Sequence, residues 1–412
     1  MSVKYYPCIY PLYFNELYVL MSLYNPFNKY GVKRVINAAT SITTLGGSIP
    51  DQSIFKAMAE AGKAFTSIPE LQVWAGKEIA KATGAEAGLP VASAVCGLQL
   101  SAAACMMRGT ELETHEPLDL KGWSHITMRL PLHTEGLRTE FIVQRTNRNT
   151  YDYSVELAGG RFREVEPREE ELLEVYDPEK TAAYYYTARN LMGSLPLEKV
   201  IEIAKVNKVP VIVDAAAEIP PRRKLRMYMD KGVDLVSFSG GKHLAGPNNS
   251  GLLAGRADLI KLAHLQSYPF SGVGRGSKMS RETIVGLVEA LWIYLDHDEE
   301  EAFTGWVRWA KYFRDELSRF PGVSAEIVYQ RVVEDGEPMA PFCAISLDES
   351  VTGVSGKALV SRLKEGEPVV YVLYEPEFLL GPCPGKITVN PQYMLEGEYP
   401  LVVEKIKQIL ES

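Results

Sequence analysis

Two side chains in the middle of the chain, a carboxylate and an amine, have the types and the spacing to do chemistry together. Asp214 ends the apolar run VPVIVD, and Lys242 follows 28 residues later, after DLVSFSGG. An amine forms a Schiff base with an aldehyde, and a carboxylate keeps an opposing pyridine nitrogen protonated because opposite charges attract. A pyridoxal phosphate ring needs both partners to act as an electron sink. We therefore predict that pyridoxal 5'-phosphate is the cofactor.

Each of these residues alone has a commoner structural interpretation. An aspartate that ends a strand is often a helix cap, most lysines are solvated, and a Gly-Gly pair such as Gly240–Gly241 occurs in ordinary turns. The prediction depends on both residues following strands. Because ligands of an open parallel sheet bind outside the carboxyl ends of its strands, we expect Asp214 and Lys242 at one crevice.

Strands and helices alternate through the central part of the chain. Short apolar runs predict buried strands, and apolar residues at helical intervals predict the helices between them. We expect strands at 141–145, 181–187, 209–214, 234–239 and 251–255, and helices at 53–65, 71–84, 97–109, 197–207, 221–232, 257–265 and 282–297. This pattern is typical of a mainly parallel sheet that helices cover on both faces.

The length and the charge limit the architecture and the partners. At about 150 residues per domain, the 412 residues predict two or three units. The 44 Lys and Arg residues against 52 Asp and Glu residues leave a net charge of −8, which repels phosphate backbones and argues against general nucleic-acid binding. We expect an N-terminal arm at residues 1–34, a large cofactor-binding domain at 35–296, and a connecting helix with a small C-terminal α/β domain at 297–412.

The apolar stretch at residues 5–24 approaches the length of a membrane span, which needs about 20 apolar residues. It contains Pro7 and Pro11, which break helices, and it lacks the basic start and cleavage site of a signal peptide. We interpret it as an arm that packs on the body or on a partner subunit, or as an over-long start before Met21. We expect a cytoplasmic protein.

The cysteines and histidines predict neither a disulfide framework nor a metal site. The five cysteines are widely spaced and contain no C-x-x-C pair, and the histidines show no H-x-x-x-H or H-E-x-x-H spacing. We therefore expect buried free thiols in a reducing compartment, no protein-built metal site, and a structural role for His243.

The sequence around Asp214 and Lys242 resembles a known family. IVDAAAEIPP and SFSGGKHLAGPNNSGLLAG resemble the selenocysteine-synthase-like branch of fold type I of the pyridoxal phosphate enzymes, and within it the D-glucosaminate-6-phosphate ammonia-lyases. VINAAT with TLGGS resembles the opening segment of that family, TGAEAGLPVASAVCGLQLSAAA its cofactor-phosphate region, and GVGRGSKMSRETIVGL its basic loop. The resemblance implies an α/β fold with an aspartate-aminotransferase-like large domain, built on a mainly parallel sheet, and a smaller C-terminal α/β domain.

The resemblance also implies a role for each matching residue. Lys242 binds the cofactor aldehyde, Asp214 binds the pyridine nitrogen, and Ala216 presents a small face to the ring. Ser239 donates its hydroxyl to the cofactor phosphate. Backbone N–H groups and the helix dipole cradle the same phosphate at a turn that consists of Ser93, Ala94, Val95, Cys96 and Gly97, where Cys96 is a small neutral residue.

Two basic residues match the family beyond the lysine. Arg275 and Lys278 are expected at a cleft shared with a neighbouring subunit, where they bind phosphate or a substrate carboxylate. A solvated basic loop is the alternative interpretation of the same residues.

The segment QRTNRNTYD departs from the family, whose members often place a histidine or an acidic residue over the cofactor ring. The aligned residue is Asn147, which cannot stack as an aromatic ring does, and Tyr151 is the alternative. Arg145 and Arg148 are, with Asn147, candidates for binding a polar or anionic substrate. The identity of the substrate therefore stays open.

The expected reaction is the α,β-elimination of a 2-amino-3-hydroxy acid, with amino sugar acids among the candidates, to a 2-keto acid and ammonia. Lys242 would remove the Cα proton as general base. The alternatives that use the same carbanion are β-replacement on an aminoacyl-tRNA, as in selenocysteine synthase, and racemase, aldolase or aminotransferase chemistry. A non-catalytic scaffold is the rival of another class, and the presence of both Asp214 and Lys242 argues against it. We expect a small-molecule substrate, a homodimer or higher homo-oligomer, and neither nucleic acid nor membrane as a partner.

Overall fold

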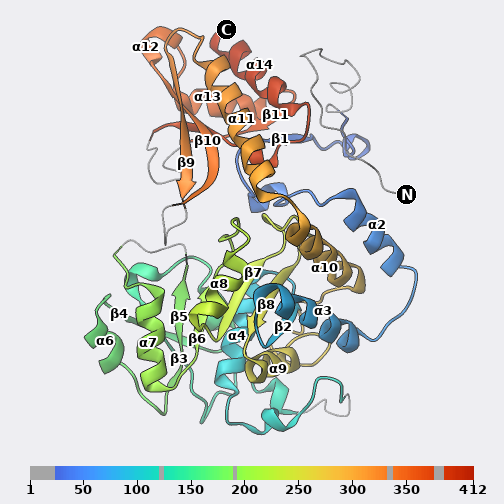
Figure 1. Ribbon diagram of the computed structural model, residues 1–412, viewed down its shortest axis with the longest axis vertical. Helices are drawn as coiled ribbons and strands as arrows, with labels where there is room; N and C mark the ends of the chain where they lie inside the picture. The colour runs from blue at the N-terminus through green and yellow to red at the C-terminus, as the bar shows by residue number, and fades with distance from the viewer. Residues whose placement is uncertain (1–23, 120–124, 189–192, 332–336, 375–384) are drawn as a thin grey trace. The chain divides into compact units, whose positions relative to one another are not determined.

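The computed structural model describes residues 24–119, 125–188, 193–331, 337–374 and 385–412. These residues form two compact units (Figure 1): residues 46–299 make up one, and residues 24–45 with the described residues from 300 onward make up the other. Most of the expected N-terminal arm lies outside the described residues. The expected large domain began at residue 35, whereas residues 35–45 group with the C-terminal unit, in which β1 (Val35–Asn37) pairs with β11 (Val369–Tyr371).

The larger unit is built on a seven-stranded sheet with the order β2-β8-β7-β6-β5-β3-β4. Its strands in chain order are β2 (Ala87–Val91), β3 (Glu140–Gln144), β4 (Arg161–Val165), β5 (Thr181–Thr187), β6 (Val211–Asp214), β7 (Leu235–Ser239) and β8 (Gly251–Gly255). Strands β7, β6, β5, β3 and β4 pair in parallel, and β8 runs antiparallel to both of its neighbours. The expected α/β fold with a mainly parallel sheet is confirmed.

Helices cover both faces of this sheet and bury two apolar layers. One layer lies between the sheet and helices α4 (Ala94–Met106), α5 (Tyr153–Leu157) and α9 (Ala257–Gln266). The other layer involves α2 (Gln52–Ala61), α3 (Ile68–Thr83), α6 (Glu169–Glu174), α7 (Leu197–Asn207), α8 (Lys224–Lys231) and α10 (Arg281–Asp296). In β5, Tyr185 points into the first layer and Tyr184 and Tyr186 into the second, as the pleat requires. Strands buried on both faces are apolar throughout, which is why apolar runs predicted them.

The two edge strands of this sheet, β2 and β4, were not expected. Strand β2 contains Pro90, and β4 is RFREV, in which only Val165 is buried. Edge strands tolerate proline and keep charges in water. The search for apolar runs therefore finds the central strands and misses the edges.

The C-terminal unit contains a four-stranded antiparallel sheet of order β12-β13-β10-β9 and the parallel pair β1-β11. Its further elements are α11 (Glu299–Leu317), β9 (Val323–Arg331), β10 (Pro338–Leu347), α12 (Glu349–Thr352), α13 (Gly356–Glu365), β12 (Leu373–Tyr374), β13 (Ile387–Val389) and α14 (Glu398–Leu410). Strands and helices share one apolar core, in which Trp309 of α11 stacks on Tyr399 of α14 with 3.9 Å between ring centroids. Across the described part of the chain, we find no helix with the length and apolar character needed to span a membrane.

Candidate active site

Strands β5, β6 and β7 bring three side chains side by side at the carboxyl ends of β5 and β6. Thr187, Asp214 and Ser237 are register partners on these adjacent parallel strands, so they project from the same face. This is the face that α4 covers, since the Ser237 hydroxyl donates to Ala94 O at 3.0 Å. Asp214 ends β6 with only 7% of its surface exposed. The carboxylate predicted from the sequence is therefore a buried strand-end residue on the α4 side of the sheet.

Two donors hold the Asp214 carboxylate. The Ala216 N–H donates to Oδ1 at 3.0 Å, and Asn149 Nδ2 donates to Oδ2 at 3.4 Å. Burial raises the pKa of Asp214 above its ordinary value, while these hydrogen bonds and the positive charge of Lys242 oppose the rise. A carboxylate that loses this much hydration is stabilised by any further cationic N–H partner.

Lys242 lies in a tightly packed loop after β7. It is half-buried, and it lies within the range over which its positive charge lowers the pKa of Asp214. The two glycines before it allow the packing: a Cβ on Gly240 would lie 2.2 Å from Ser250 Oγ, and a Cβ on Gly241 would lie 2.6 Å from Asn248 Cα. The Gly-Gly pair is therefore a packing requirement at this position.

The segment TLGGS supports the same loop. The Ser48 N–H and hydroxyl both donate to Gly241 O, at 3.0 and 3.1 Å. A Cβ on Gly47, whose φ is +77°, would come within 2.3 Å of that oxygen. This segment thus holds the carbonyl that directly precedes Lys242.

The first turn of α4 has the geometry of an anion site. Ser93 caps the helix, and its Oγ accepts from the Cys96 N–H at 3.0 Å. The N–H groups of a first helical turn lack intrahelical acceptors and lie at the positive end of the dipole. Gly251 lets this turn approach the sheet, because a Cβ there would lie 2.9 Å from the Ser93 carbonyl carbon, and Gly251 pairs with Ser239. The structure thus places the start of α4 beside Ser239, as a phosphate site requires.

Two residues of this turn, Gly97 and Cys96, face the interior of the protein. A Cβ on Gly97 would lie 2.2 Å from Ser237 Oγ, so α4 packs directly on β7. Burial raises the pKa of Cys96, and the Ser277 hydroxyl opposes the rise. Cys96 is therefore a neutral thiol. Among the described residues the free cysteines are Cys96, Cys105 and Cys343, all of them buried, and the other two cysteines of the chain lie outside the described residues.

Buried polar groups hold the start of the basic loop after α9. Gln72 Nε2 donates to Tyr268 O at 2.8 Å, so its Oε1 accepts from His264 Nε2 at 3.0 Å. Burial lowers the pKa of His264 to about 4, so the ring is neutral at neutral pH. The Arg275 guanidinium lies over the Tyr268 ring, 4.9 Å from its centroid, whereas Lys278 is exposed. Arg275 thus packs on a tyrosine whose backbone is held by Gln72. Lys278 is exposed to solvent in the single chain.

Asn147, which was expected to bind substrate, is instead buried inside the protein. Its side chain is fully buried, Nδ2 donates to Thr187 O at 2.8 Å, and Oδ1 accepts from the Thr187 N–H at 2.6 Å. The amide ties η5 (Arg145–Asn147) to the end of β5. We therefore correct its expected substrate role to a structural one, because both ends of the amide bond to the backbone of Thr187.

The two arginines of this segment are engaged by carboxylates. Arg145 Nε lies 2.9 Å from Glu166, and Arg148 donates to Asp152 at 2.5 Å and to Glu164 at 2.7 Å. Both glutamates flank or belong to β4, the edge strand that was not expected. The two arginines therefore serve ion pairs here, while Tyr151, half exposed at 51%, stays a candidate for covering a cofactor ring.

Sequence reasoning missed three residues of the site: Asn149, Ser237 and Gly251. Asn149 lies in the same segment as Asn147, but no spacing rule distinguishes the two amides. Ser237 and Gly251 lie within predicted strands, Ser237 two residues before Ser239 and Gly251 twelve residues after it. Only their neighbours in space show that they shape the site.

The residues of this site fit pyridoxal phosphate. The buried Asp214 carboxylate suits the ring nitrogen, the Lys242 amine suits the aldehyde, and the small Ala216 follows beside the carboxylate. The first turn of α4 and the Ser239 hydroxyl offer N–H and O–H donors for a phosphate dianion. The donor set thus matches each end of the cofactor with a group of complementary chemistry.

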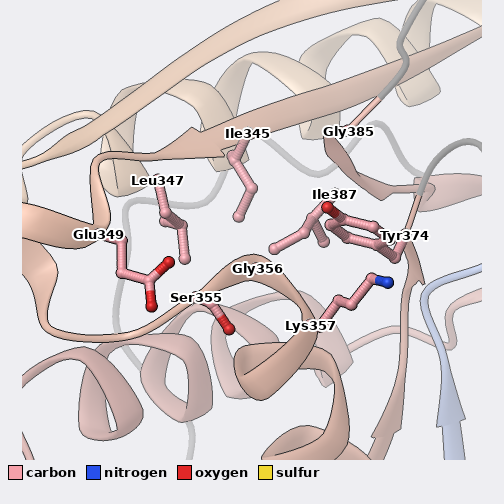
Figure 2. Close-up of a pocket in the computed structure, with 9 residues that line it drawn as sticks. All are labelled: Ile345, Leu347, Glu349, Ser355, Gly356, Lys357, Tyr374, Gly385 and Ile387. Carbon is pink, nitrogen blue, oxygen red and sulfur yellow. The ribbon is translucent and has the colours of Figure 1, made fainter.

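A separate pocket of about 250 Å³ lies in the C-terminal unit. Figure 2 shows Ser355 and Lys357 at the start of α13 on one side and Tyr374 with Ile387 on another. Neither Asp214 nor Lys242 lines it, and we assign it no role in the chemistry. Among the described residues, no group of three or more His, Cys, Asp or Glu side chains is arranged to hold a metal ion.

The chain is similar to one family model and to several known proteins. Residues 160–279 match the aminotransferase class-V family model. The chain is 28% identical over 393 residues to a D-glucosaminate-6-phosphate ammonia lyase of Salmonella typhimurium, covering 94% of this chain and 98% of the relative. It is 27% identical over 397 residues to a 5'-C-glycyluridine monooxygenase-decarboxylase of a Streptomyces species, covering 93% and 92%. An Escherichia coli L-seryl-tRNA(Sec) selenium transferase is 29% identical over 119 residues, which is 27% of this chain.

Solved structures give the same result for the fold. A D-glucosaminate-6-phosphate ammonia-lyase superposes with a TM-score of 0.79 at 27% identity, over 94% of this chain and 98% of the other. A NifS-like protein, at 18% identity and a TM-score of 0.55, shows the fold alone. The resemblance stated from the sequence is therefore confirmed.

Proposed function

We propose that this chain, which has an aminotransferase class-V domain and the fold of type I pyridoxal phosphate enzymes, is a pyridoxal phosphate-dependent ammonia-lyase of an amino sugar acid. The substrate is a 2-amino-3-hydroxy acid, and the products are a 2-keto acid and ammonia. The observation that supports the proposal is that the charge of Lys242, in the loop after β7, acts on the buried Asp214 carboxylate at the end of β6. The fold that positions them is shared with a D-glucosaminate-6-phosphate ammonia-lyase over 94% of the chain.

Pyridoxal phosphate supplies an aldehyde that links to amines and a ring that accepts the electron pair of a deprotonated Cα. Asp214 has acceptor capacity left for the ring nitrogen, since a carboxylate accepts about four hydrogen bonds and two come from Ala216 and Asn149. A cationic N–H there also relieves the cost of burying the charge. Asp214 would therefore keep the ring nitrogen protonated when the cofactor is bound.

Lys242 has two successive tasks. Its amine would hold the cofactor aldehyde at rest and would be free when a substrate amine is bound there instead. The free amine then takes the Cα proton as general base and returns a proton to the departing β-hydroxyl. One water leaves the substrate and one water is consumed when the imine is hydrolysed, so the net change is loss of ammonia and formation of the keto acid.

The phosphate of the cofactor is assigned to the first turn of α4. The Ser93 oxygen already accepts from the Cys96 N–H, so its hydroxyl proton is directed elsewhere. Ser239 on the neighbouring strand β7 adds a second hydroxyl. The remaining donors are backbone N–H groups of the turn, which consists of Ser93, Ala94, Val95, Cys96 and Gly97.

Substrate binding is assigned to Arg275 and Lys278, at a cleft shared between subunits. The exposed apolar residues of the single chain support an oligomer: Phe65 is 97% exposed and Ile49 is 62% exposed. Side chains of this size are commonly covered in assemblies. A homodimer or larger homo-oligomer in the cytoplasm, built around the cofactor sites, is the assembly we propose.

Oxidative decarboxylation is the second candidate function. It is favoured by the full-length similarity to a 5'-C-glycyluridine monooxygenase-decarboxylase. Selenocysteine-synthase-like β-replacement has less support, because similarity to the selenium transferases covers about a quarter of the chain and the net charge is −8. Asp214 and Lys242 would hold the cofactor in the same way for each of these reactions. Identification of the substrate is therefore what distinguishes among them.

The proposal is tested in two steps. Borohydride reduction of the protein with its cofactor, followed by peptide mass spectrometry, should find the reduced adduct on Lys242, and Lys242→Ala should carry none. Ammonia and keto-acid release across a panel of phosphorylated and unphosphorylated amino sugar acids should then identify the substrate. Oxygen uptake with carbon dioxide release, in place of simple elimination, would select the oxidative candidate, and an adduct on another lysine would refute the site.

A further inference from the structure

Asn149 connects the carboxylate of Asp214 to the end of strand β5. Its Nδ2 donates to Thr187 Oγ1 at 2.9 Å and to Asp214 Oδ2 at 3.4 Å. Its Oδ1 accepts from the Tyr151 N–H at 2.6 Å. Because an N–H can only donate, the Tyr151 contact fixes which end of the amide is the oxygen. The amide therefore presents a donor to Asp214, whichever substrate the site takes.

Asp152 holds the backbone of Asn149. Asp152 Oδ2 accepts from the Asn149 N–H at 2.9 Å and from Arg148 Nε at 2.5 Å. The side chain of Asp152 is fully buried, and the buried Tyr185 is among its neighbours. The backbone and both polar atoms of the Asn149 side chain are thus held, so the position of the donor is set by the fold rather than by Asp214.

The two donors on Asp214 act on different oxygens. The Ala216 N–H binds Oδ1 and Asn149 binds Oδ2. A single donor leaves a carboxylate free to rotate about its last side-chain torsion, whose energy profile is broad. A second donor on the other oxygen fixes the plane of the group. Both donors also favour the charged form, which burial disfavours.

We propose that Asn149 is a positioning residue of the ring-nitrogen site: it holds Asp214 Oδ2 so that the carboxylate meets the pyridine nitrogen of the cofactor in a fixed orientation. This inference rests on the proposed function. Asn149 would act on the cofactor through its hydrogen bond to Asp214. Its contribution must therefore depend on the presence of the ring nitrogen, which a merely structural role would not.

Binding of two compounds to the cofactor-free protein separates these roles. The dissociation constants of pyridoxal phosphate and of its 1-deaza analogue, in which CH replaces the ring nitrogen, are measured by equilibrium dialysis. The wild type should prefer pyridoxal phosphate, and Asp214→Asn should lose most of that preference. Asn149→Ser should lower the preference about tenfold, the usual effect of one hydrogen bond to a charged group, with little change in affinity for the analogue. Serine can still accept from the Tyr151 N–H and so keeps the local turn.

Gln144→Ser is the matched control. Gln144 is also a buried amide at the end of a strand, and it bonds to the backbone of Leu195. Its loss should change both affinities by the same factor and leave the preference intact. Asn149→Ala provides a second variant with the same expected loss of preference, should the serine variant fold poorly.

The outcomes are distinct for the two proposals. A preference in Asn149→Ser equal to that of the wild type, or affinities for both compounds that fall together, would overturn the positioning role and leave the proposed function standing. A wild-type protein that binds neither compound would overturn the cofactor assignment itself and this inference with it. A wild type that binds both equally would overturn the pairing of Asp214 with the ring nitrogen, and this inference with it, but not the cofactor.

Discussion

Gly251 and Ser93 lie so close together that no side chain fits between them. A Cβ at Gly251 would come within 2.9 Å of the Ser93 carbonyl carbon and 2.8 Å of Phe238 O. Both obstacles are backbone atoms, which cannot rotate away as a side chain does. This contact joins the sheet to the first turn of α4, where we place the cofactor phosphate.

Gly251→Ala should therefore push the start of α4 away from β7. We expect a loss of about 1–3 kcal/mol in the free energy of unfolding, the usual cost of overpacking, and weaker binding of the cofactor. Urea unfolding and equilibrium dialysis measure the two effects. Gly276→Ala is the control, because a Cβ there meets nothing within 4 Å; equal effects of the two changes would contradict the close-contact argument.

Asp214→Asn should not destabilise the cofactor-free protein at neutral pH. Burial raises the pKa of Asp214, so the folded state binds this proton more tightly than the unfolded chain does. The stabilisation is complete below the ordinary value of 3.8 and is lost as the pH rises through the raised folded value. At neutral pH the buried, charged carboxylate therefore lowers the free energy of unfolding. The uncharged amide of the Asp214→Asn variant removes this cost.

The free energy of unfolding of the wild type and of Asp214→Asn is measured from neutral pH down to the ordinary value of 3.8, with and without pyridoxal phosphate. Any advantage of the variant should shrink on acidification, and the cofactor should stabilise the wild type more than the variant. An Asp214→Asn protein that gains as much as the wild type from the cofactor would speak against an interaction with the ring nitrogen.

His264→Gln should remove an acid-sensitive part of the stability. Burial lowers the pKa of His264 from 6.5 to about 4, so its contribution is fully present above pH 6.5 and is lost as the pH falls toward 4. The fall of the pKa from 6.5 to about 4 corresponds to about 3 kcal/mol of stability. The slope of unfolding free energy against pH should be shallower in the variant over this interval, and parallel curves would contradict the burial of a neutral ring.

Breaking the ion pair of Lys224 and Glu218 should strongly destabilise the larger unit. The two side chains are 0% and 3% exposed, and Lys224 Nζ lies 2.7 Å from Glu218 Oε2. Lys224→Met leaves a buried carboxylate without this cation, at a cost of about 3–5 kcal/mol. The double change Lys224→Met with Glu218→Gln should recover much of the loss. A double-mutant cycle by urea unfolding measures the coupling, and additive effects would show that the pair is not coupled.

Local chemistry in the sequence predicted much of the fold. The expected segments 181–187 and 251–255 coincide with β5 and β8, and the expected helix at 197–207 coincides with α7. These elements are buried on defined faces, so the spacing of apolar residues reports them directly. The edge strands β2 and β4 carry proline or charges and lack that signal.

Asp214 and Lys242 could be singled out from the sequence alone, because their side-chain types and the strands before them are local properties. The tertiary structure alone decided their surroundings: Asn149 reaches Asp214 from 65 residues earlier in the chain, and Arg148 turns to Glu164 on an edge strand instead of to a substrate. Pattern in a sequence records which face of an element is buried, whereas hydrogen bonds depend on distances between elements that only packing sets. The same reason separates Asn147 from Asn149, two identical side chains of which one holds the backbone of Thr187 and the other the carboxylate of the site.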